Sequence, residues 1–480
     1  MAETIERKEL ENLQQDLDDV RELLRRHRLV ESLVERQPMR KHELVETLVH
    51  KQHLAELRAK LDEMHPADVA YILEALPIEE RLTVWDLVKA ERDGEILLEL
   101  SEPVRESLIR TMDSDELVAA VETLDTDEIA ELAPDLPDEV IQDVFQALPV
   151  EEREQLRAAM SYPEDAVGAL MDFDVVSVRE DVTLEVVTRY LRRFEELPDH
   201  TDQLFVVDRD QRLKGVLPIA RLVVTDLETP VTEVMLQEFV ALYPDDKAQD
   251  AAQAFERYDL VSAAVIDQAG KLVGRVTVDA VVDFIRAKSE SEALAMGGLR
   301  ETEDLFAPVW ESLKNRWSWL AVNLITAFIA SRVIGVFEGS IEKLVALAAL
   351  MPIVAGIGGN SGNQTTTMIV RALALGQIQV EQAKKLFAKE IAVAIANGLV
   401  WGGILGVIAY LLYSSVKLGA VMTAAMTLNL LLAGVMGVAI PIAMAKLGRD
   451  PAIGSSVMIT ACTDSGGFFI FLGLATLFLL

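Results

Sequence analysis

The sequence has a single cysteine, Cys462, in 480 residues. One thiol excludes a disulfide framework and a metal site built from several thiolates. No histidine follows His200, so imidazole cannot bind a metal in the second half of the chain. The opening residues, MAETIERKEL, lack the apolar stretch of a signal peptide, and the N-terminal half is therefore expected to stay in the cytoplasm.

Positive charge is also scarce, because 45 Lys and Arg residues stand against 78 Asp and Glu residues, for a formal net charge of −33. The imbalance lies before residue 299. Residues 299–480 hold 12 basic and 10 acidic residues, which leaves 33 basic and 68 acidic ones in the preceding part. This argues against nucleic acid as a partner, since phosphate backbones need positive surface. The acidity favours divalent cations as partners.

The second half contains what a soluble enzyme lacks, namely five long runs with little charge. Each can cross a hydrocarbon core of about 30 Å as a helix, and together they predict a five-helix transmembrane bundle that contacts the lipid bilayer. The runs are 317–337, 344–370, 391–416, 418–445 and 452–480. An odd number of spans from a cytoplasmic N-terminus places the C-terminus outside the cytoplasm. Basic residues such as Lys384 and Lys385 support this, because they fall on the predicted inner side.

The part before residue 161 is predicted to be helical throughout. Leucines at 3,4 spacing indicate amphipathic helices for residues 1–55. In residues 56–160, the segment LPIEER at 76–81 returns as LPVEER at 148–153, and such a repeat is typical of a stacked α-superhelix. This domain could be a solubilising scaffold or a regulatory sensor. Three polar residues before short apolar runs are predicted helix N-caps: Ser114, Asp125 and Asp138.

Between residues 161 and 285 the pattern changes to short strands alternating with helices. Two related units each run strand, helix, strand, acidic turn and Leu-x-Gly-Val/Arg. This β-α-β pattern resembles a tandem pair of CBS domains, with the first at 161–226 and the second at 227–285. The whole chain is thus predicted to be a multidomain membrane protein of α and α+β class.

The resemblance to CBS domains implies a site for an adenine nucleotide such as ATP. Gly274 and Thr277 of the second unit fit the usual nucleotide pattern. Ala280 stands where that pattern has an acid for the ribose hydroxyls, and Asp279 comes one position early. The displaced acid argues against ATP, which stays an open alternative.

Four carboxylates surround the end of the second unit and the start of a linking helix predicted for 286–308: Asp279, Asp283, Glu290 and Glu292. Asp279 and Asp283 are four residues apart, so they share one helix face and repel each other. Such charges usually form a solvated face. Because this segment leads directly into the membrane domain, 309–480, a cation that neutralises them could instead act on a pore.

Asp464 is the one charged residue in the last apolar run. An ionised side chain at that depth is costly and usually faces a bundle interior or a wet pathway. The second run carries GIGGNSGNQTTT at 356–367, whose amides, hydroxyls and exposed backbone offer neutral oxygens. Neutral oxygens with one carboxylate suit Mg²⁺, a hard cation that loses water reluctantly.

The domain order, with PIVAGIGGNSGNQTTT and LGRDPAIGSS…TACTDSGG, resembles the MgtE family of magnesium channels. The resemblance implies a homodimer in the bacterial inner membrane, with the pore at the dimer axis. It also implies that Mg²⁺ is both transported and regulatory, binding acidic clusters of the cytoplasmic domains to close the pore. The residues implied for the pore are Gly356, Gly359, Asn360, Asn363, Thr367, Asp450 at the inner mouth, and Asp464. Thr460, one turn before Asp464, would add a backbone carbonyl.

Two other functions stay open. The chain could transport another divalent cation, such as Co²⁺ or Mn²⁺, or it could be a membrane-anchored CBS sensor that does not conduct. Asp464 and the polar second run favour conduction, because a plain anchor needs neither. The sequence shows no nucleophile–base pair and no metal triad, so an enzyme is not expected.

Overall fold

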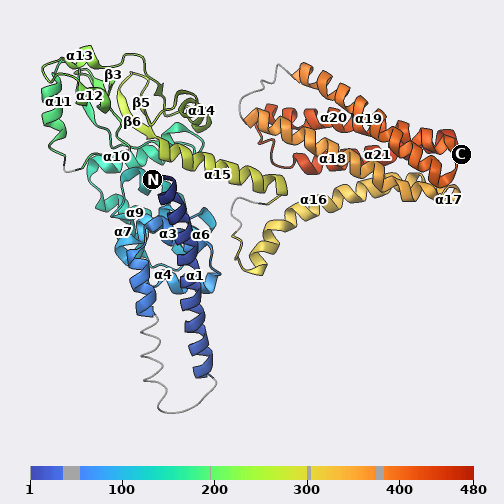
Figure 1. Cartoon of the computed structure of the whole chain (residues 1–480), viewed down its shortest axis with the longest axis horizontal. Helices are drawn as coiled ribbons and strands as arrows, with labels where there is room; N and C mark the ends of the chain where they lie inside the picture. The colour runs from blue at the N-terminus through green and yellow to red at the C-terminus, as the bar shows by residue number, and fades with distance from the viewer. Residues whose placement is uncertain (1, 36–53, 195, 300–303, 375–382) are drawn as a thin grey trace. The chain divides into compact units, whose positions relative to one another are not determined.

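The computed structural model describes residues 2–35, 54–194, 196–299, 304–374 and 383–480 (Figure 1). The chain divides into two compact units. The first comprises Met1–Ala287 together with Asp304–Phe306, and the second comprises Lys288–Glu303 and Ala307–Leu480. Part of the predicted 1–55 helices lies outside the described residues.

The N-terminal part of the first unit is a stack of short helices behind one long helix. One hydrophobic core runs through it without interruption, from Leu17 to Leu156, and Val20 and Leu24 of the first helix are buried in it. This continuous core confirms the predicted helical stack. Its elements are α1 (Ala2–Glu35), α3 (Pro66–Glu74), α4 (Ile78–Trp85), η1 (Ala90–Arg92), α5 (Asp93–Leu98), α6 (Glu102–Ile109), α7 (Ser114–Val121), α8 (Thr126–Leu132), η2 (Ala133–Asp135), α9 (Asp138–Ala147) and α10 (Val150–Ala159).

The repeated LPxEER segments have the same local role in both copies. Each starts a helix directly after its proline, α4 in the first copy and α10 in the second. The Arg81 Nη2 donates to the carbonyl of Leu76 at 3.3 Å, and the Arg153 Nη2 donates to the carbonyl of Leu148 at 2.9 Å. Each arginine therefore satisfies the carbonyl of the leucine that opens its own segment, at the end of the preceding helix.

One of the three predicted N-caps is confirmed. Asp125 caps α8, and its backbone N–H donates to the Glu128 Oε2 at 2.9 Å. Ser114 is instead the first helical residue after the cap Asp113. Asp138 is the first helical residue after Pro137, with no side-chain cap. The capping box explains the first shift, because it pairs the cap with a Glu three residues later.

The second half of the first unit contains two small sheets with the same topology. In each, the first strand pairs parallel with the second, and the second pairs antiparallel with the third. This confirms the duplicated β-α-β pattern. The strands are β1 (Ser177–Arg179), β2 (Gln203–Val207) and β3 (Leu213–Pro218), then β4 (Ala241–Leu242), β5 (Ser262–Ile266) and β6 (Leu272–Thr277), and the helices are η3 (Val167–Leu170), α11 (Leu184–Leu191), α12 (Ile219–Val224), α13 (Val231–Val234) and α14 (Ala248–Tyr258).

The glycine of each Leu-x-Gly segment is required by close packing of a methionine. A Cβ on Gly274 would lie 2.4 Å from the Met171 Cγ, and a Cβ on Gly215 would lie 3.1 Å from the Met235 Sδ and 2.7 Å from the Leu236 carbonyl. Neither position has room for a larger residue. The same residue types thus meet at equivalent points of the two units.

The linking helix α15 (Val278–Gly297) begins directly after β6 and therefore starts earlier than the segment predicted for 286–308. It ends where Gly298 adopts a φ of +75°, which favours glycine. A Cβ on Gly298 would lie 2.1 Å from the Trp319 ring, so the turn has no space for a side chain. Residues 304–308 do not continue this helix.

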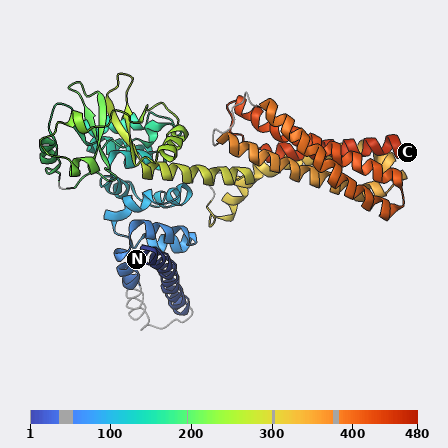
Figure 2. The ribbon, with the colours of Figure 1, turned by 45° about the horizontal axis from the view of Figure 1, so that its top comes forward.

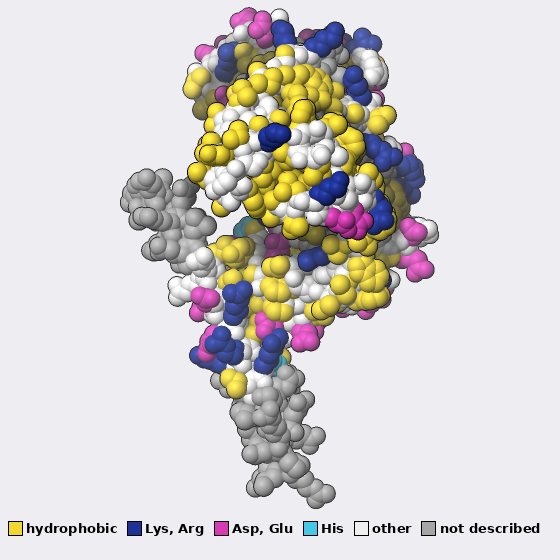
Figure 3. Space-filling model, turned by 90° about the vertical axis from the view of Figure 1, so that its right-hand side faces the viewer, with side chains coloured by type: hydrophobic (Ala, Val, Ile, Leu, Met, Phe, Trp, Pro, Cys, Tyr) yellow, Lys and Arg dark blue, Asp and Glu magenta, His cyan; other side chains and the backbone are white. Residues whose placement is uncertain are grey.

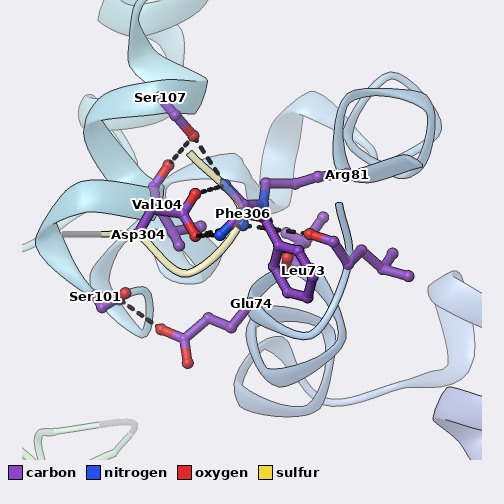
Figure 4. A network of polar contacts seen from close by, with 9 residues as sticks. Leu73, Glu74, Arg81, Ser101, Val104, Ser107, Asp304 and Phe306 are labelled. Carbon is purple, nitrogen blue, oxygen red and sulfur yellow. Dashed lines mark hydrogen bonds and ion pairs between the residues drawn. The ribbon is translucent and has the colours of Figure 1, made fainter. Parts of the chain in front are cut away.

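Residues Asp304–Phe306 pack on the helical part of the first unit (Figure 4). The Arg81 side chain, which is completely buried, donates to Asp304 through Nη1 at 2.6 Å and through Nη2 at 3.3 Å. Arg81 also donates to the Leu73 carbonyl at 2.9 Å and to the Ser107 hydroxyl at 3.3 Å. The backbone N–H of Phe306 donates to Asp304 at 2.9 Å. We call this arrangement the Arg81–Asp304 clamp.

The second unit is a bundle of long helices, and α18 to α21 run alongside one another in both views (Figures 1 and 2). Many large hydrophobic side chains of α16 and α19 are exposed, and Figure 3 shows hydrophobic side chains among polar ones at the end of this unit near the C-terminus. Such a surface suits contact with lipid. The helices are α16 (Val309–Val336), α17 (Glu338–Lys343), α18 (Ala346–Ala374), α19 (Ala383–Tyr413), α20 (Val416–Lys446) and α21 (Ser455–Leu479).

By length and composition, four helices of the described chain can cross a membrane: α16, α19, α20 and α21. The remaining predicted span, the second run, corresponds to α18, which is 29 residues long and packs against α20 and α21. Its segment 356–367 lowers its apolar content, because six of the residues there are Asn, Gln or Thr. The helix thus has the length of a span without its usual hydropathy.

Candidate functional site

The polar segment 356–367 of α18 is divided between two faces of the helix. Gly358 and Gly362 lie on a buried face. A Cβ on Gly358 would lie 2.2 Å from the Asn429 Nδ2 of α20, and a Cβ on Gly362 would lie 2.7 Å from the Ile459 Cγ2 of α21. These glycines therefore let α18 pack closely against both neighbouring helices.

The opposite face of α18 is exposed and carries Gly356, Asn360 and Thr367. These residues follow the spacing of three to four that places side chains on one side of a helix. Polar groups on the outside of a membrane helix are costly in lipid, so this face needs water or another chain beside it. We call it the polar face of α18.

Asn363 lies between the two faces, and its side-chain oxygen is not used in a hydrogen bond within the described part of the chain. Its Oδ1 is buried and has no hydrogen-bond partner among the described residues. Buried polar atoms in proteins are nearly always bonded to protein or to ordered water. This oxygen is therefore available to a bound water or a hydrated ion.

Asp464 lies in the middle of α21, about 14 Å along the helix from its start at Ser455, at 1.5 Å per residue. It is thus not a helix cap. Its neighbour Thr463 is fully buried, and a Cβ on Gly359 would lie 3.6 Å from the Thr463 Oγ1. This contact places the turn that carries Asp464 and Thr460 against the glycine-rich turn of α18.

The structure thus places seven of the predicted pore residues on two adjoining helices: Gly356, Gly359, Asn360, Asn363 and Thr367 on α18, and Thr460 and Asp464 on α21. Asp450 lies apart from them, in the connection between α20 and α21. Its Oδ1 accepts from the Ala452 N–H at 2.8 Å, and its Oδ2 lies 3.8 Å from the Lys288 Nζ of α15. Asp450 is therefore beside the linking helix.

The predicted sensor carboxylates fall into different units. Asp279 and Asp283 belong to the first, and Glu290 and Glu292 belong to the second. Burial and the Asp279 charge raise the pKa of Asp283, which agrees with the repulsion expected from their spacing. Burial also raises the pKa of Glu292, where Lys288 opposes the effect and Asp450 adds to it.

A second acidic surface in the first unit is formed by residues that were not among the predicted sensor carboxylates. Carboxylates of the α8 region face carboxylates of the CBS pair. Burial, followed by the charge of Asp172, raises the pKa of Asp127 to about 7. Burial and the charges of Asp174 and Asp199 raise the pKa of Asp125. We call Asp125, Asp127, Asp172, Asp174 and Asp199 the acidic interface.

No group of three or more His, Cys, Asp or Glu side chains in the described part of the chain is close enough together to hold a metal ion. Within the acidic interface, Asp172 is also paired with Arg275, whose Nη2 lies 2.7 Å from the Asp172 Oδ2. No local pattern marks these residues as one surface, since Asp125 and Asp127 are ordinary members of a strongly acidic segment.

Three known sequence families match this chain. They are the MgtE intracellular N domain over residues 64–165, the CBS domain over 167–225 and 231–287, and MgtE, described as a divalent cation transporter, over 351–474. These matches agree with the helical stack, the two β-α-β units and the helical bundle.

Two relatives are similar over most of their length. The magnesium transporter MgtE of Thermus thermophilus is 31% identical over 444 residues, 88% of this chain and 95% of the relative. The magnesium transporter MgtE of Bacillus subtilis is 28% identical, over 89% of this chain and 94% of the relative. A crystal structure of the cytosolic domain of the Mg²⁺ channel MgtE in complex with ATP is 32% identical, with a TM-score of 0.45, and covers 50% of this chain and 98% of its own.

Proposed function

The chain belongs to the MgtE family, a family of transporters and not of enzymes, and we propose that it is a Mg²⁺ channel that closes when cytosolic Mg²⁺ is high. It is a multi-pass membrane protein with an intracellular N domain. We further propose a bacterial inner-membrane location, with the C-terminus outside the cytoplasm.

The observation that carries the proposal is the packing of α18 on α21, which brings the polar segment 356–367 against the turn that carries Asp464. Mg²⁺ is usually held through its own waters by one or two carboxylates. Asp464 supplies the carboxylate, and Asn360, Asn363 and Thr367 supply neutral oxygens for the hydrating waters. The unpaired Asn363 Oδ1 supports this role. Gly356, Gly359 and Thr460 would add backbone groups, with Asp450 at the inner mouth.

The exposure of the polar face supports a homodimer. Lipid cannot satisfy Asn360 and Thr367, whereas a second copy would enclose them with its own polar face. Two copies would also bring two Asp464 carboxylates to one axis. A doubled negative charge with surrounding waters favours a divalent over a monovalent ion.

The acidic interface supports closure by cytosolic Mg²⁺. Without bound cations, the charges of Asp172 and Asp174 oppose those of Asp127 and Asp125, and this repulsion disfavours close packing of the helical and CBS parts. Mg²⁺ bound between them would favour the compact arrangement, since a ligand shifts an equilibrium only by binding one state better. Asp279, Asp283, Glu290 and Glu292 along α15 would extend this sensing surface toward the membrane.

ATP is not included in the proposal. Asp279, which comes one position early for the nucleotide pattern, lies with its Oδ1 3.5 Å from the His200 Nε2 of the first CBS unit. This contact occupies the carboxylate nearest to the place where the pattern has its acid.

The test is ion flux into liposomes that contain the purified chain, with Mg²⁺, Co²⁺ and Mn²⁺ offered separately. We expect Mg²⁺ flux in the wild type and none in Asp464→Ala, with a strong loss in Asp464→Asn, because the ion loses its charged partner. Glu338→Gln, which removes an exposed carboxylate from α17, is the matched control and should conduct normally. Wild-type flux in Asp464→Ala would remove Asp464 from the pathway, and a wild type without flux would leave a sensor as the function.

A further inference from the structure

A second carboxylate lies inside the helical bundle, on α19. Glu390 is only 5% exposed. Removing a carboxyl group from water costs several kcal/mol unless it is bonded, and ionisable residues buried in membrane helices usually have a function. No local pattern singles out Glu390, because it follows three lysines near the predicted inner end of a span.

Glu390 contacts the polar segment 356–367 of α18. The Thr365 Oγ1 of α18 donates to the Glu390 Oε2 at 3.1 Å. Thr365 is itself only 5% exposed and lies on the buried side of the helix. Its sequence neighbours Asn363 and Thr367 belong to the proposed pathway. The other carboxylate oxygen, Oε1, lies 3.6 Å from the Lys389 Nζ.

Glycines of α20 bring the three helices together at this level. A Cβ on Gly437 would lie 2.9 Å from the Thr365 Cβ, and a Cβ on Gly434 would lie 3.3 Å from the Glu390 carbonyl oxygen. The Thr366 Oγ1 also donates to the Gly437 carbonyl at 3.4 Å. Packing this close leaves little room for α18 to turn while the bond between Thr365 and Glu390 is intact.

We propose that Glu390 is a positioning residue for cation permeation. Glu390 accepts the hydrogen bond of Thr365 on the buried side of α18 and so fixes the rotation of this helix about its axis. That rotation sets the positions of the oxygens of Asn360, Asn363 and Thr367. A rotation of about 15° moves a side-chain atom some 5 Å from the helix axis by about 1 Å, and sites of this kind need placement within about 0.5 Å. The inference rests on the proposed Mg²⁺ flux.

The experiment compares Glu390→Ala, Glu390→Gln and Thr365→Val in liposomes, and reads the ratio of Mg²⁺ to Co²⁺ flux. This ratio does not depend on how much protein is folded, because a smaller folded fraction lowers both fluxes equally. We expect Glu390→Ala and Thr365→Val each to lower Mg²⁺ flux at least about fivefold and to change the ratio, because each removes one hydrogen bond to a carboxylate. Glu390→Gln keeps an acceptor oxygen and should preserve the wild-type ratio.

Two comparisons complete the design. The double variant Glu390→Ala/Thr365→Val should be no worse than either single variant, since both remove the same bond. Glu338→Gln controls for loss of a carboxylate elsewhere in the unit. The proposal is overturned if Thr365→Val keeps the wild-type ratio, or if Glu390→Gln fails as completely as Glu390→Ala. Flux in the wild type separates either result from failure of the proposed function.

Discussion

Replacing Asp304 with alanine should lower the free energy of unfolding of the helical part of the first unit by about 3 kcal/mol. This is the cost of leaving a buried charge without its partner. The Arg81 side chain is fully buried, and Asp304 is its one carboxylate partner among the described residues. After the substitution, the guanidinium keeps only neutral acceptors: the Leu73 and Leu76 carbonyls and the Ser107 hydroxyl. Because these bonds remain, the expected loss of unfolding free energy lies at the lower end of the range for breaking a buried ion pair.

The assay is hydrogen exchange on the full-length protein, followed by mass spectrometry of peptides from α3, α4 and α6. A loss of about 3 kcal/mol should speed exchange in these helices about 100-fold, where exchange occurs through opening of this part. The exposed pair Arg110–Glu106 provides the control, because Glu106→Gln should change exchange by less than a factor of about five. Asp304→Asn keeps the shape of the side chain and should have an intermediate effect.

The apolar double variant Arg81→Met/Asp304→Leu tests the reason for the effect. It removes both charges, so most of the protection should return, as replacement of buried ion pairs by hydrophobic residues often shows. Exchange in Asp304→Ala that stays within about threefold of wild type would refute the reasoning, since Arg81 would then not depend on its partner. A double variant that exchanges as fast as Asp304→Ala would show that lost packing, and not unpaired charge, is the cause.

Three further predictions concern the whole chain. Folding raises the pKa of Asp127 from 3.8 to about 7, so the folded state holds the proton more tightly, and stability of the first unit in EDTA should fall as pH rises from about 4 to 7. Asp127→Asn should reduce this dependence of stability on pH, measured by thermal unfolding. The pH dependence left in the variant would be due partly to Asp93, whose pKa is about 6. An unchanged pH dependence would contradict the role of Asp127. Deleting residues 1–287 should leave Mg²⁺ flux that persists at high internal Mg²⁺, and a truncated channel that still closes would place the sensor in the second unit. A tag after Leu480 should react with membrane-impermeant reagents in intact cells while a tag before Met1 does not, and labelling of the N-terminal tag would overturn the topology.

Local patterns were enough to predict the architecture. The LPxEER repeat, the Leu-x-Gly segments and the apolar runs each express a short-range rule, whether of helix ends, strand turns or membrane thickness. The start of α15 was missed for the same reason. The apolar spacing of the second CBS unit continues through Val281 and Phe284 into the linking segment, and no glycine or proline interrupts it before Gly297.

The contacts that carry charge could not be predicted in this way. Asp127 faces Asp172, and Arg81 binds Asp304, only because distant segments fold together. Glu390 was hidden by its neighbours, since a Glu after Lys389 is typical of a solvated helix end. Asp464 was found from the sequence because isolation in an apolar run is itself a local signal.

The two LPxEER copies differ in the contacts of one side chain, the arginine. Both arginines still close the end of the preceding helix. The Arg81 Nε also binds the Leu73 carbonyl and its Nη atoms bind Asp304, whereas the Arg153 Nε is buried without a partner among the described residues. Arg81 thus has a second structural role beyond the helix end that both arginines share. Selection should therefore tolerate drift at Arg153 more readily than at Arg81, where one replacement would disturb both a helix end and the attachment of the chain just before it enters the membrane.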